Sequence, residues 1–459
     1  MGSIVFFSII IFSLFLAIRS KQKRKDNSTR DFVIASNQFG AKLIFFLIAG
    51  EVYTMSTIMG FPGGIYANGP TYGIWFLGYI LLAYPIGYII GPKIWQAGQR
   101  YQAITMPDVF RGYFKSRVLE VLVALITIIF LIPVGQIQFT GLVVILQSLG
   151  WHLDPVILIL FSAMLAFAYI SISGIRGSAY ISVLKDIIML LAIVLAGLAV
   201  TVHVGVADLF SLSSEKIQHQ MTSSQLIFTM TTIVFQALGF YIFPHAFQSF
   251  FTAKSASAIR RSQIAMPLYM LMYPFIIIVA YYALAHDLHL EHPNQAFLAV
   301  AQLLLPDWLL GVIAAGASLA GLVVLAAICL AIGPMFVRNV IPNVAEDKQK
   351  MSAKLVIVVY LFMSILMALY SPGLMIDMLK TAYYGVTQLF LGVLIAIYQW
   401  PIRRELVIAG ILGGEVFSIS AYIINFDFMG INIGLLGLIF NVLIVLLGTC
   451  IWGKAKQFD

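Results

Sequence analysis

Two charged residues that could exchange protons stand side by side in an apolar run. Lys185 and Asp186 lie in YISVLKDIIMLLAIVLAGLAV, residues 180–200, where no other residue carries a charge. Each charge costs at least ~2.5–3.5 kcal/mol at the middle of a membrane-spanning helix. Burial disfavours the charged form of an amine, so such a lysine could bind a proton in one conformation and release it in another. The alternative is that its long stem carries the ammonium back to the membrane interface.

Two carboxylates could share in this chemistry. Successive helix residues point about 100° apart, so we expect Asp186 to face away from the groove of Lys185. It would then bond a backbone group or a hydroxyl, with a role in gating. Glu51 interrupts another apolar run, GAKLIFFLIAGEVYTMSTIMGFPGG. It could pair with Lys185 or carry a proton of its own, and both remain open. Lys185, Asp186 and Glu51 are the candidate ion-coupling residues.

A histidine and several uncharged groups could bind a small anion. His245 follows Pro244 in MTTIVFQALGFYIFPHAFQSFF. It could contact a carboxylate or share in proton release, or it could be a hydrogen-bonded packing residue. Free amides at the start of a half-helix would help to neutralise such an anion. The candidate hydroxyl and amide contacts are Tyr53, Thr54, Gln138, Gln236 and Tyr241. For each of these, a buried polar residue satisfied by a neighbour is the alternative.

Other chemistries lack their residues. The sequence has no glycine-rich nucleotide motif, no His-Glu metal pattern and no nucleophile elbow, so an enzyme or an ATP-driven pump is not expected. Its two cysteines, Cys329 and Cys450, lie far apart in apolar runs and indicate neither a disulfide nor a metal site. We therefore expect no cofactor, no metal site, no nucleic-acid partner and no obligate protein partner.

The elements that must position these residues are membrane-spanning helices. Hydrophobic residues make up 61% of the chain, charged residues 10%, and the mean hydropathy is +0.98, which indicates an all-α polytopic membrane protein. Basic cytoplasmic loops explain the net charge of +8 better than nucleic-acid binding does. Thirteen segments are long enough to span the bilayer: 3–18, 38–60, 70–92, 118–147, 155–173, 179–202, 224–250, 264–286, 308–334, 354–372, 375–399, 406–426 and 432–453.

Lys and Arg concentrate in alternate loops. The segment after the first span reads RSKQKRKDNSTR, and later basic positions include Arg111, Arg117, Arg338, Lys454 and Lys456. By the positive-inside rule the N-terminus is outside and the C-terminus is cytoplasmic, in a multi-pass protein of the cell (plasma) membrane. A signal peptide is the alternative for the first span. No basic residue precedes that span, however, and no small-residue cleavage site follows it.

Two spans carry the signs of a broken helix. The first contains Gly50 and Glu51, and the second contains Gly239 and Pro244. Unwound backbone is tolerated inside a membrane only where it faces protein or a wet cavity. Without the N-terminal span these are helices 1 and 6, as two inverted five-helix repeats with a site near the midplane require. The expected organisation is 1–37 for the N-terminal helix and basic loop, 38–202 and 203–400 for the two repeats, and 401–459 for two C-terminal helices.

Several motifs follow one another in a familiar order. They include GEVYTMSTIMGFPGGIYANG, YPIGYIIGPKIWQAGQRYQAITMPDVFRGYF, IPVGQIQFTG, SGIRGSAYISVLKDI, QALGFYIFPHAFQSFFTAKSASAIRRSQIAMPLY and AICLAIGPMFVRNVIPNV. Together they resemble the sodium:solute symporter family, and within it the monocarboxylate permease branch. The resemblance implies a leucine-transporter-like core of ten helices in two inverted repeats, with helices 1 and 6 broken. It also implies secondary active transport by alternating access.

Two features depart from what the resemblance implies for sodium-coupled relatives. Such relatives place adjacent hydroxyl residues on helix 8, where this sequence has Val323 and Val324. Valine offers no oxygen to a sodium ion, although Ser318 could supply one if the register slips. Lys185 stands where many sodium-coupled relatives have Thr or Ser, and some proton-coupled proteins of this core fold use a lysine there. These departures favour the proton over sodium as the coupling ion.

The sequence thus predicts a symporter that imports a small organic anion, which we expect to be a monocarboxylate, with proton coupling through Lys185. One bound cation offsets the charge of the anion while the loaded carrier crosses a low-dielectric barrier. The alternative is a sodium-coupled symporter of an amino acid or another small solute. A transport-dead sensor or binding module fits less well because no output domain follows residue 459. A channel fits less well because broken helices indicate a closed site.

Overall fold

The computed structural model describes the chain except residues 22–28, 152, 217–220, 342–343, 345, 372, 454 and 456–459. The described residues form helices, and apart from one isolated bridge between Phe39 and Ala253 they contain no β-structure. Helices dominate because a backbone surrounded by lipid must satisfy its own N–H and C=O groups. The predicted all-α class is confirmed. The basic segment 22–28, Lys454 and Lys456, which contributed to the predicted orientation, lie outside the described residues.

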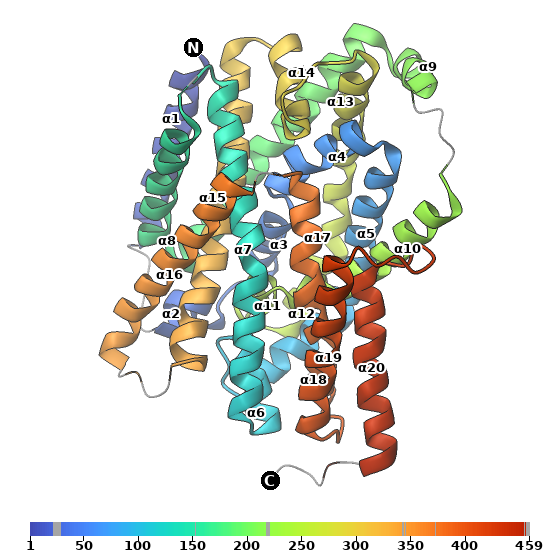
Figure 1. Ribbon diagram of the computed structural model, residues 1–459. Helices are drawn as coiled ribbons and strands as arrows, with labels where there is room; N and C mark the ends of the chain where they lie inside the picture. The colour runs from blue at the N-terminus through green and yellow to red at the C-terminus, as the bar shows by residue number, and fades with distance from the viewer. Residues whose placement is uncertain are drawn as a thin grey trace.

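The helices follow one another in a single bundle, with the two chain ends at opposite ends of it (Figure 1). In chain order they are α1 (Gly2–Lys21), α2 (Thr29–Ile34), α3 (Ala41–Val52), α4 (Phe61–Asn68), α5 (Pro70–Arg100), α6 (Met106–Phe114), α7 (Arg117–Ser148), α8 (Pro155–Val204), α9 (Val206–Lys216), α10 (Ser223–Gly239), α11 (Pro244–Phe251), α12 (Ala256–Ala265), α13 (Tyr273–Ala285), α14 (Ala296–Leu304), α15 (Asp307–Asn339), α16 (Glu346–Tyr370), α17 (Met375–Val386), α18 (Phe390–Tyr398), α19 (Arg404–Ile423) and α20 (Ile433–Trp452). Short turns of other helix types are η1 (Ala35–Asn37), η2 (Ser56–Gly60), η3 (Phe240–Ile242), η4 (Met266–Met272), η5 (Pro293–Gln295) and η6 (Thr387–Leu389).

The membrane spans match the apolar segments of the sequence. Among the described residues, 11 helices are long and apolar enough to cross a membrane, or 12 if the bent pair Ala41–Val52 and Ser56–Asn68 is one span. The predicted span 155–173 falls on a shorter apolar helix, Pro155–Tyr169. The predicted span 179–202 falls on a separate candidate span, Ile175–Val204, and in Figure 1 the chain of α8 runs down and then back up to α9, as two spans require.

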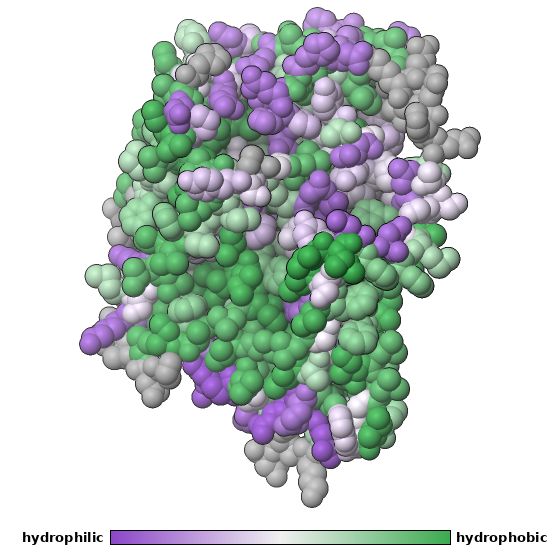
Figure 2. Space-filling model, in the orientation of Figure 1, coloured by the Kyte–Doolittle hydropathy of each residue, from purple (hydrophilic) through white to green (hydrophobic). Residues whose placement is uncertain are grey.

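The helix α15 is the centre of the bundle. In its most apolar window 94% of the residues are buried, and it packs against α1, α7, α8 and α16. Its run AAGASLAGLVVLAAICLAIG is rich in small residues, which let neighbouring helices approach closely. Other spans expose apolar side chains. On the face shown in Figure 2, apolar residues cover much of the lower half, over α7, α19 and α20, and hydrophilic residues gather at the two ends of the molecule. That apolar band is the surface that lipid covers.

Two helices are broken in the interior of the bundle, in the spans where breaks were predicted. In the first, Tyr53 and Thr54 leave the helix after α3, and the chain continues in η2 and α4 at an angle of 47°. In the second, Phe243 adopts an extended conformation (φ −54°, ψ 130°) between η3 and α11. Pro244 begins α11, a position that suits proline because its missing N–H needs no partner there. The predicted leucine-transporter-like core with broken helices 1 and 6 is confirmed.

Backbone hydrogen bonds tie these two broken helices together at one end. The N–H of Phe39, just before α3, donates to the carbonyl of Thr252 at 2.9 Å, and the N–H of Lys254 donates to the carbonyl of Phe39 at 2.9 Å. Nearby, Gln248 of α11 donates through Nε2 to the carbonyl of Val33 at 2.9 Å. The beginning of α3 and the end of α11 are therefore held as one unit.

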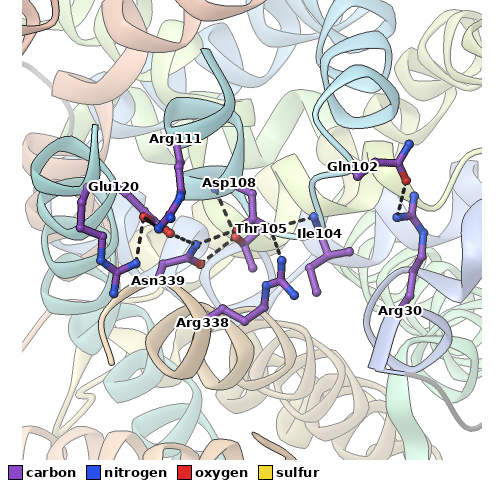
Figure 3. Close-up of polar contacts among 10 residues, drawn as sticks. Arg30, Gln102, Ile104, Thr105, Asp108, Arg111, Glu120, Arg338 and Asn339 are labelled. Atoms are coloured by element: carbon purple, nitrogen blue, oxygen red, sulfur yellow. Dashed lines mark hydrogen bonds and ion pairs between the residues drawn. The ribbon is translucent and has the colours of Figure 1, made fainter. Parts of the chain in front are cut away.

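A buried polar network fastens α6 and α7 to the end of α15 (Figure 3). The Nδ2 amide of Asn339 donates to Asp108 Oδ1 at 2.7 Å and to Glu120 Oε1 at 2.8 Å. The Thr105 hydroxyl donates to Asn339 Oδ1 at 2.8 Å. The carboxylates also pair with arginines: Arg111 and Arg117 with Glu120, and Arg338 with Asp108. A single neutral amide thus separates two carboxylates and satisfies both.

This network makes the charge at position 339 decisive for stability. We predict that Asn339→Asp lowers the thermal unfolding midpoint of the detergent-solubilised protein more than Asn339→Ala does. An aspartate would place a third carboxylate against Asp108 and Glu120, a buried charge conflict of about 3–5 kcal/mol. Alanine removes only the hydrogen bonds, at about 1–3 kcal/mol. Equal midpoints for the two variants would contradict this account of the network.

Candidate functional site

A cavity lies beside the two helix breaks and holds about 610 Å³ of empty space, part of it at an open mouth. The walls come from both broken helices and from α5, α7, α15 and α17. The lining residues are Ile48, Glu51, Val52, Thr54, Ser56, Phe76, Tyr79, Val134, Gln138, Phe240, Phe243, His245, Ala246, Val324, Leu379 and Tyr383. A mostly apolar wall with a few polar groups is typical of a site for one small molecule.

Four of the predicted residues line this cavity: Glu51, Thr54, Gln138 and His245. Three of them carry a buried polar atom that has no hydrogen-bond partner, namely Glu51 Oε2, Gln138 Oε1 and His245 Nδ1. Thr54 accepts a hydrogen bond from the backbone N–H of Ser56 at 3.1 Å and so shapes the first break. Buried polar atoms are normally paired. Three such atoms around one cavity are free to bond polar groups of a ligand or water.

Three other predicted contact residues lie outside the cavity wall. The ring of Tyr53 packs 4.7 Å from that of Tyr269, and its hydroxyl lies 3.9 Å from a methionine sulfur. The Tyr241 hydroxyl donates to Gln263 Oε1 at 2.6 Å. Gln236 is buried with Oε1 unpartnered, but it does not reach the cavity. These three residues are buried, but they are not among the residues that line the cavity.

Lys185 of α8 reaches the break of α3. Its side chain is 0% exposed, and its Nζ donates to the carbonyls of Gly50 and Tyr53, each at 3.0 Å. The last carbonyls of a helix lack intrahelical donors and form the negative end of its dipole. The Lys185 ammonium therefore lies at the negative, carbonyl end of α3, where a positive charge is most favourable. The alternative in which Lys185 extends to the membrane interface is wrong.

Asp186 lies beside Lys185 rather than on a separate face. Its Oδ1 is 2.9 Å from Lys185 Nζ, and its Oδ2 accepts a hydrogen bond from the Tyr269 hydroxyl at 2.9 Å. The expectation that the two side chains cannot share a groove is wrong, because the long lysine stem spans the difference in direction between neighbouring residues. The hydroxyl contact was expected for Asp186. Its role in gating stays a prediction.

Glu51 forms no ion pair with Lys185 among the described contacts. Its Oε1 lies 2.6 Å from the Ser249 hydroxyl, which also lies 3.0 Å from the carbonyl of His245. One hydroxyl proton can fully serve only one of these acceptors. If Glu51 Oε1 carries a proton, it donates to Ser249 and Ser249 donates to the His245 carbonyl, which satisfies these three groups and leaves Glu51 Oε2 free toward the cavity. The geometry thus accommodates a protonated Glu51.

The residues considered for a sodium ion lie in α15. Ser318 is buried and its hydroxyl has no hydrogen-bond partner. Val323 and Val324 are buried, and Val324 lines the cavity. Ser318 therefore offers one free oxygen, and the two valines offer none from their side chains.

An aromatic wall was not anticipated from the sequence. The rings of Tyr79 and Tyr383 lie 5.6 Å apart between centroids, and those of Phe243 and Tyr383 lie 4.8 Å apart. All three residues line the cavity, together with Phe240. Position next to a predicted break could have indicated Phe240 and Phe243. Nothing distinguishes Tyr79 or Tyr383 in a chain with 21 tyrosines and 34 phenylalanines.

Sequence comparisons place this geometry among transport proteins. Residues 32–413 match the profile of the sodium:solute symporter family. An uncharacterised symporter of Bacillus subtilis is 28% identical over 99% of this chain and 98% of its own length. A monocarboxylate transport permease of Rhizobium johnstonii is 25% identical over 80% of this chain and 77% of its own. The sodium/pantothenate symporter of Escherichia coli is 21% identical over 97% of this chain and 95% of its own.

Solved structures share the fold. A Na⁺-coupled sialic acid symporter, in a substrate-bound outward-open state, superposes with a TM-score of 0.83 at 16% identity, over 100% of this chain and 99% of its own. A nucleobase-cation-symport-1 family transporter in a closed conformation gives a TM-score of 0.58 at 12% identity, over 95% of this chain and 97% of its own. At these identities the likeness concerns the fold alone.

The close approach of α3 and α8 at Gly50 gives a test of the site geometry. We predict that Gly50→Ala lowers the thermal unfolding midpoint, because the added Cβ would lie 2.7 Å from Ser182 Oγ and 3.6 Å from Lys185 Nζ. Gly40→Ala is the matched control, since its Cβ would meet nothing closer than 3.9 Å. Adding Ser182→Ala should restore part of the loss. A Gly50→Ala protein as stable as Gly40→Ala would refute this packing.

Proposed function

The chain belongs to the sodium:solute symporter family and is a symporter, and we propose that it imports a small monocarboxylate across the plasma membrane with proton coupling. The observation that carries the proposal is the cavity between the two helix breaks, with its unpartnered polar atoms. Alternating access closes such a site to each side in turn.

The cavity has the groups that a single carboxylate needs. His245 and Ala246 begin α11 and line the cavity. The first N–H groups of a helix lack intrahelical acceptors, and the helix dipole favours an anion there. His245 Nδ1 can donate as well when it carries a proton. The apolar and aromatic remainder of the wall suits a short carbon skeleton, and the resemblance to a monocarboxylate permease agrees with this choice.

Proton coupling is supported by the position of Lys185. A protonated amine satisfies the carbonyls of Gly50 and Tyr53 and the carboxylate of Asp186 at once. A neutral amine holds these acceptors far less strongly, because charge-assisted hydrogen bonds are about twice as strong as neutral ones. Loss of the proton would therefore loosen α3 from α8 at the break. In this proposal that change links the proton to the opening of the site.

Glu51 fits as a second proton carrier. An ionised Glu51 in the cavity wall would repel a carboxylate substrate, so the anion binds when Glu51 is neutral. Its contact with Ser249 allows that state. Sodium is the competing coupling ion, favoured by the sodium-coupled relatives and by the free hydroxyl of Ser318.

The main test is uptake into proteoliposomes under separate ion gradients. Labelled lactate, pyruvate, acetate and proline are offered with an inward proton gradient or an inward sodium gradient. We expect a monocarboxylate to accumulate with the proton gradient alone, and Lys185→Ala to lose this accumulation while the protein remains folded. Strict sodium dependence, with Lys185→Ala still active, would overturn the proton coupling and leave the symporter.

Glu51→Gln tests the second carrier separately. Glutamine resembles the neutral acid, so we expect the variant to bind substrate and exchange it across the membrane. Concentrative uptake should fall at least tenfold, because one proton-binding group is gone. The measurement compares exchange with net accumulation in the same vesicles. Full concentrative uptake by this variant would remove Glu51 from the coupling scheme.

The proposed orientation has the N-terminus outside and the C-terminus in the cytoplasm. The termini lie at opposite ends of the bundle (Figure 1), as an odd number of crossings requires. Arg111, Arg117 and Arg338 gather in the polar network at one end of α7 and α15. The positive-inside rule assigns that end to the cytoplasm.

A further inference from the structure

A second lysine lies within a membrane span, away from Lys185. Lys380 of α17 has a side chain that is only 15% exposed. Its Nζ lies 2.6 Å from Asp377 Oδ1, 5.3 Å from the ring centroid of Tyr72 and 5.6 Å from that of Phe228. The aromatic faces attract the ammonium and exclude water from around it. Lysines inside spans are rare and are candidates for function.

The surroundings of Lys380 already hold a carboxylate. Asp377 Oδ1 accepts from Lys380 Nζ and, at 3.4 Å, from the Tyr72 hydroxyl. The Asp377 side chain is 48% exposed, so its carboxylate sits at the edge of water while the lysine is mostly covered. An ammonium, a hydroxyl and two ring faces would receive the carboxylate of a small organic acid in the same way.

This cluster is close to the cavity along two helices. On α17, Leu379 and Tyr383 line the cavity, one residue before Lys380 and three residues after it. On α5, Tyr72 lies one turn before the cavity residue Phe76. Phe228 comes from the first turns of α10. The cluster thus lies near the starts of α5, α10 and α17, which the proposed orientation places at the outer end.

We propose that Lys380 and Tyr72 form an outer carboxylate site, where the substrate anion binds before it reaches the cavity and displaces Asp377 from Lys380. The proposal rests on the proposed function, because it requires a monocarboxylate substrate. Exchange of one carboxylate for another keeps the ammonium paired throughout. The substrate is therefore attracted without being trapped, and Asp377 returns when the anion moves inward.

A purely structural ion pair would behave differently. Such a pair would add only slightly to stability and would contribute nothing to the capture of a ligand. An outer carboxylate site instead changes the apparent affinity from outside. It also makes capture sensitive to salt, because ions screen the attraction between Lys380 and the approaching anion.

The experiment measures initial rates of labelled lactate uptake into right-side-out membrane vesicles. Ionic strength is varied between about 0.01 and 0.15 M, where the Debye length falls from about 30 to 8 Å. We expect Lys380→Gln to raise KM at least fivefold, to keep the maximal rate within twofold, and to lose most of the salt dependence of KM. Lys380→Arg should retain the wild-type KM within twofold.

Asp377→Asn decides the outcome even if Lys380→Gln fails to fold. Removing the competing carboxylate should lower KM at least twofold, and an unchanged or higher KM overturns the proposal. Lys93→Gln is the matched control. Lys93, on α5, also has its Nζ near an aromatic ring, 5.9 Å from the ring centroid of Tyr398 on α18, but it lies away from the Lys380 cluster. If wild-type vesicles take up no monocarboxylate, the proposed function fails. If they do, and folded Lys380→Gln keeps the wild-type KM and salt dependence, only the outer site fails.

Discussion

The rest of the structure depends on the hydrogen bonds that the Lys185 ammonium donates to the carbonyl end of the broken helix α3. A break inside the membrane leaves carbonyl groups that lipid cannot satisfy. Lys185 supplies the donors, and in doing so it binds α8 to α3 through Gly50 and Tyr53. Gly50 is the residue that permits this approach, since a Cβ there would meet Ser182. A buried charge is expensive, and here Asp186 and the two carbonyls compensate for that expense.

The second break is satisfied by different means, and this difference shapes the cavity. Pro244 begins α11 without an N–H to satisfy, and His245 and Ala246, the next residues of this amide end, line the cavity. Lys185 therefore supplies a fixed cation at one break, and in the proposed function the substrate anion binds at the other. The cavity has opposite electrostatic ends because its two broken helices present opposite termini to it. Tyr79, Phe243 and Tyr383 pack against one another and supply an apolar part of the same cavity wall.

The fold follows from hydropathy and from the residues that break helices, and both can be read without a structure. The apolar segments matched helices, and the Gly and Pro positions matched the breaks. Glu51, Thr54, Gln138 and His245 were placed at the cavity because polar residues in apolar spans are few. Tyr79 and Tyr383 were missed because aromatic residues are everywhere in this chain. The error over Lys185 and Asp186 came from treating Cα directions as side-chain directions, which a flexible four-carbon stem does not obey.

Two backbone hydrogen bonds of Phe39 join the start of α3 to the segment that follows α11. The N–H of Phe39 donates to the carbonyl of Thr252, and the N–H of Lys254 donates to the carbonyl of Phe39, so separating α3 from the segment after α11 would break both bonds. Shortly before Phe39, the residues Ala35, Ser36 and Asn37 all adopt left-handed backbone conformations, which are unfavourable for L-residues. The chain therefore turns sharply between α2 and α3, just before the backbone hydrogen bonds that join α3 to the segment after α11.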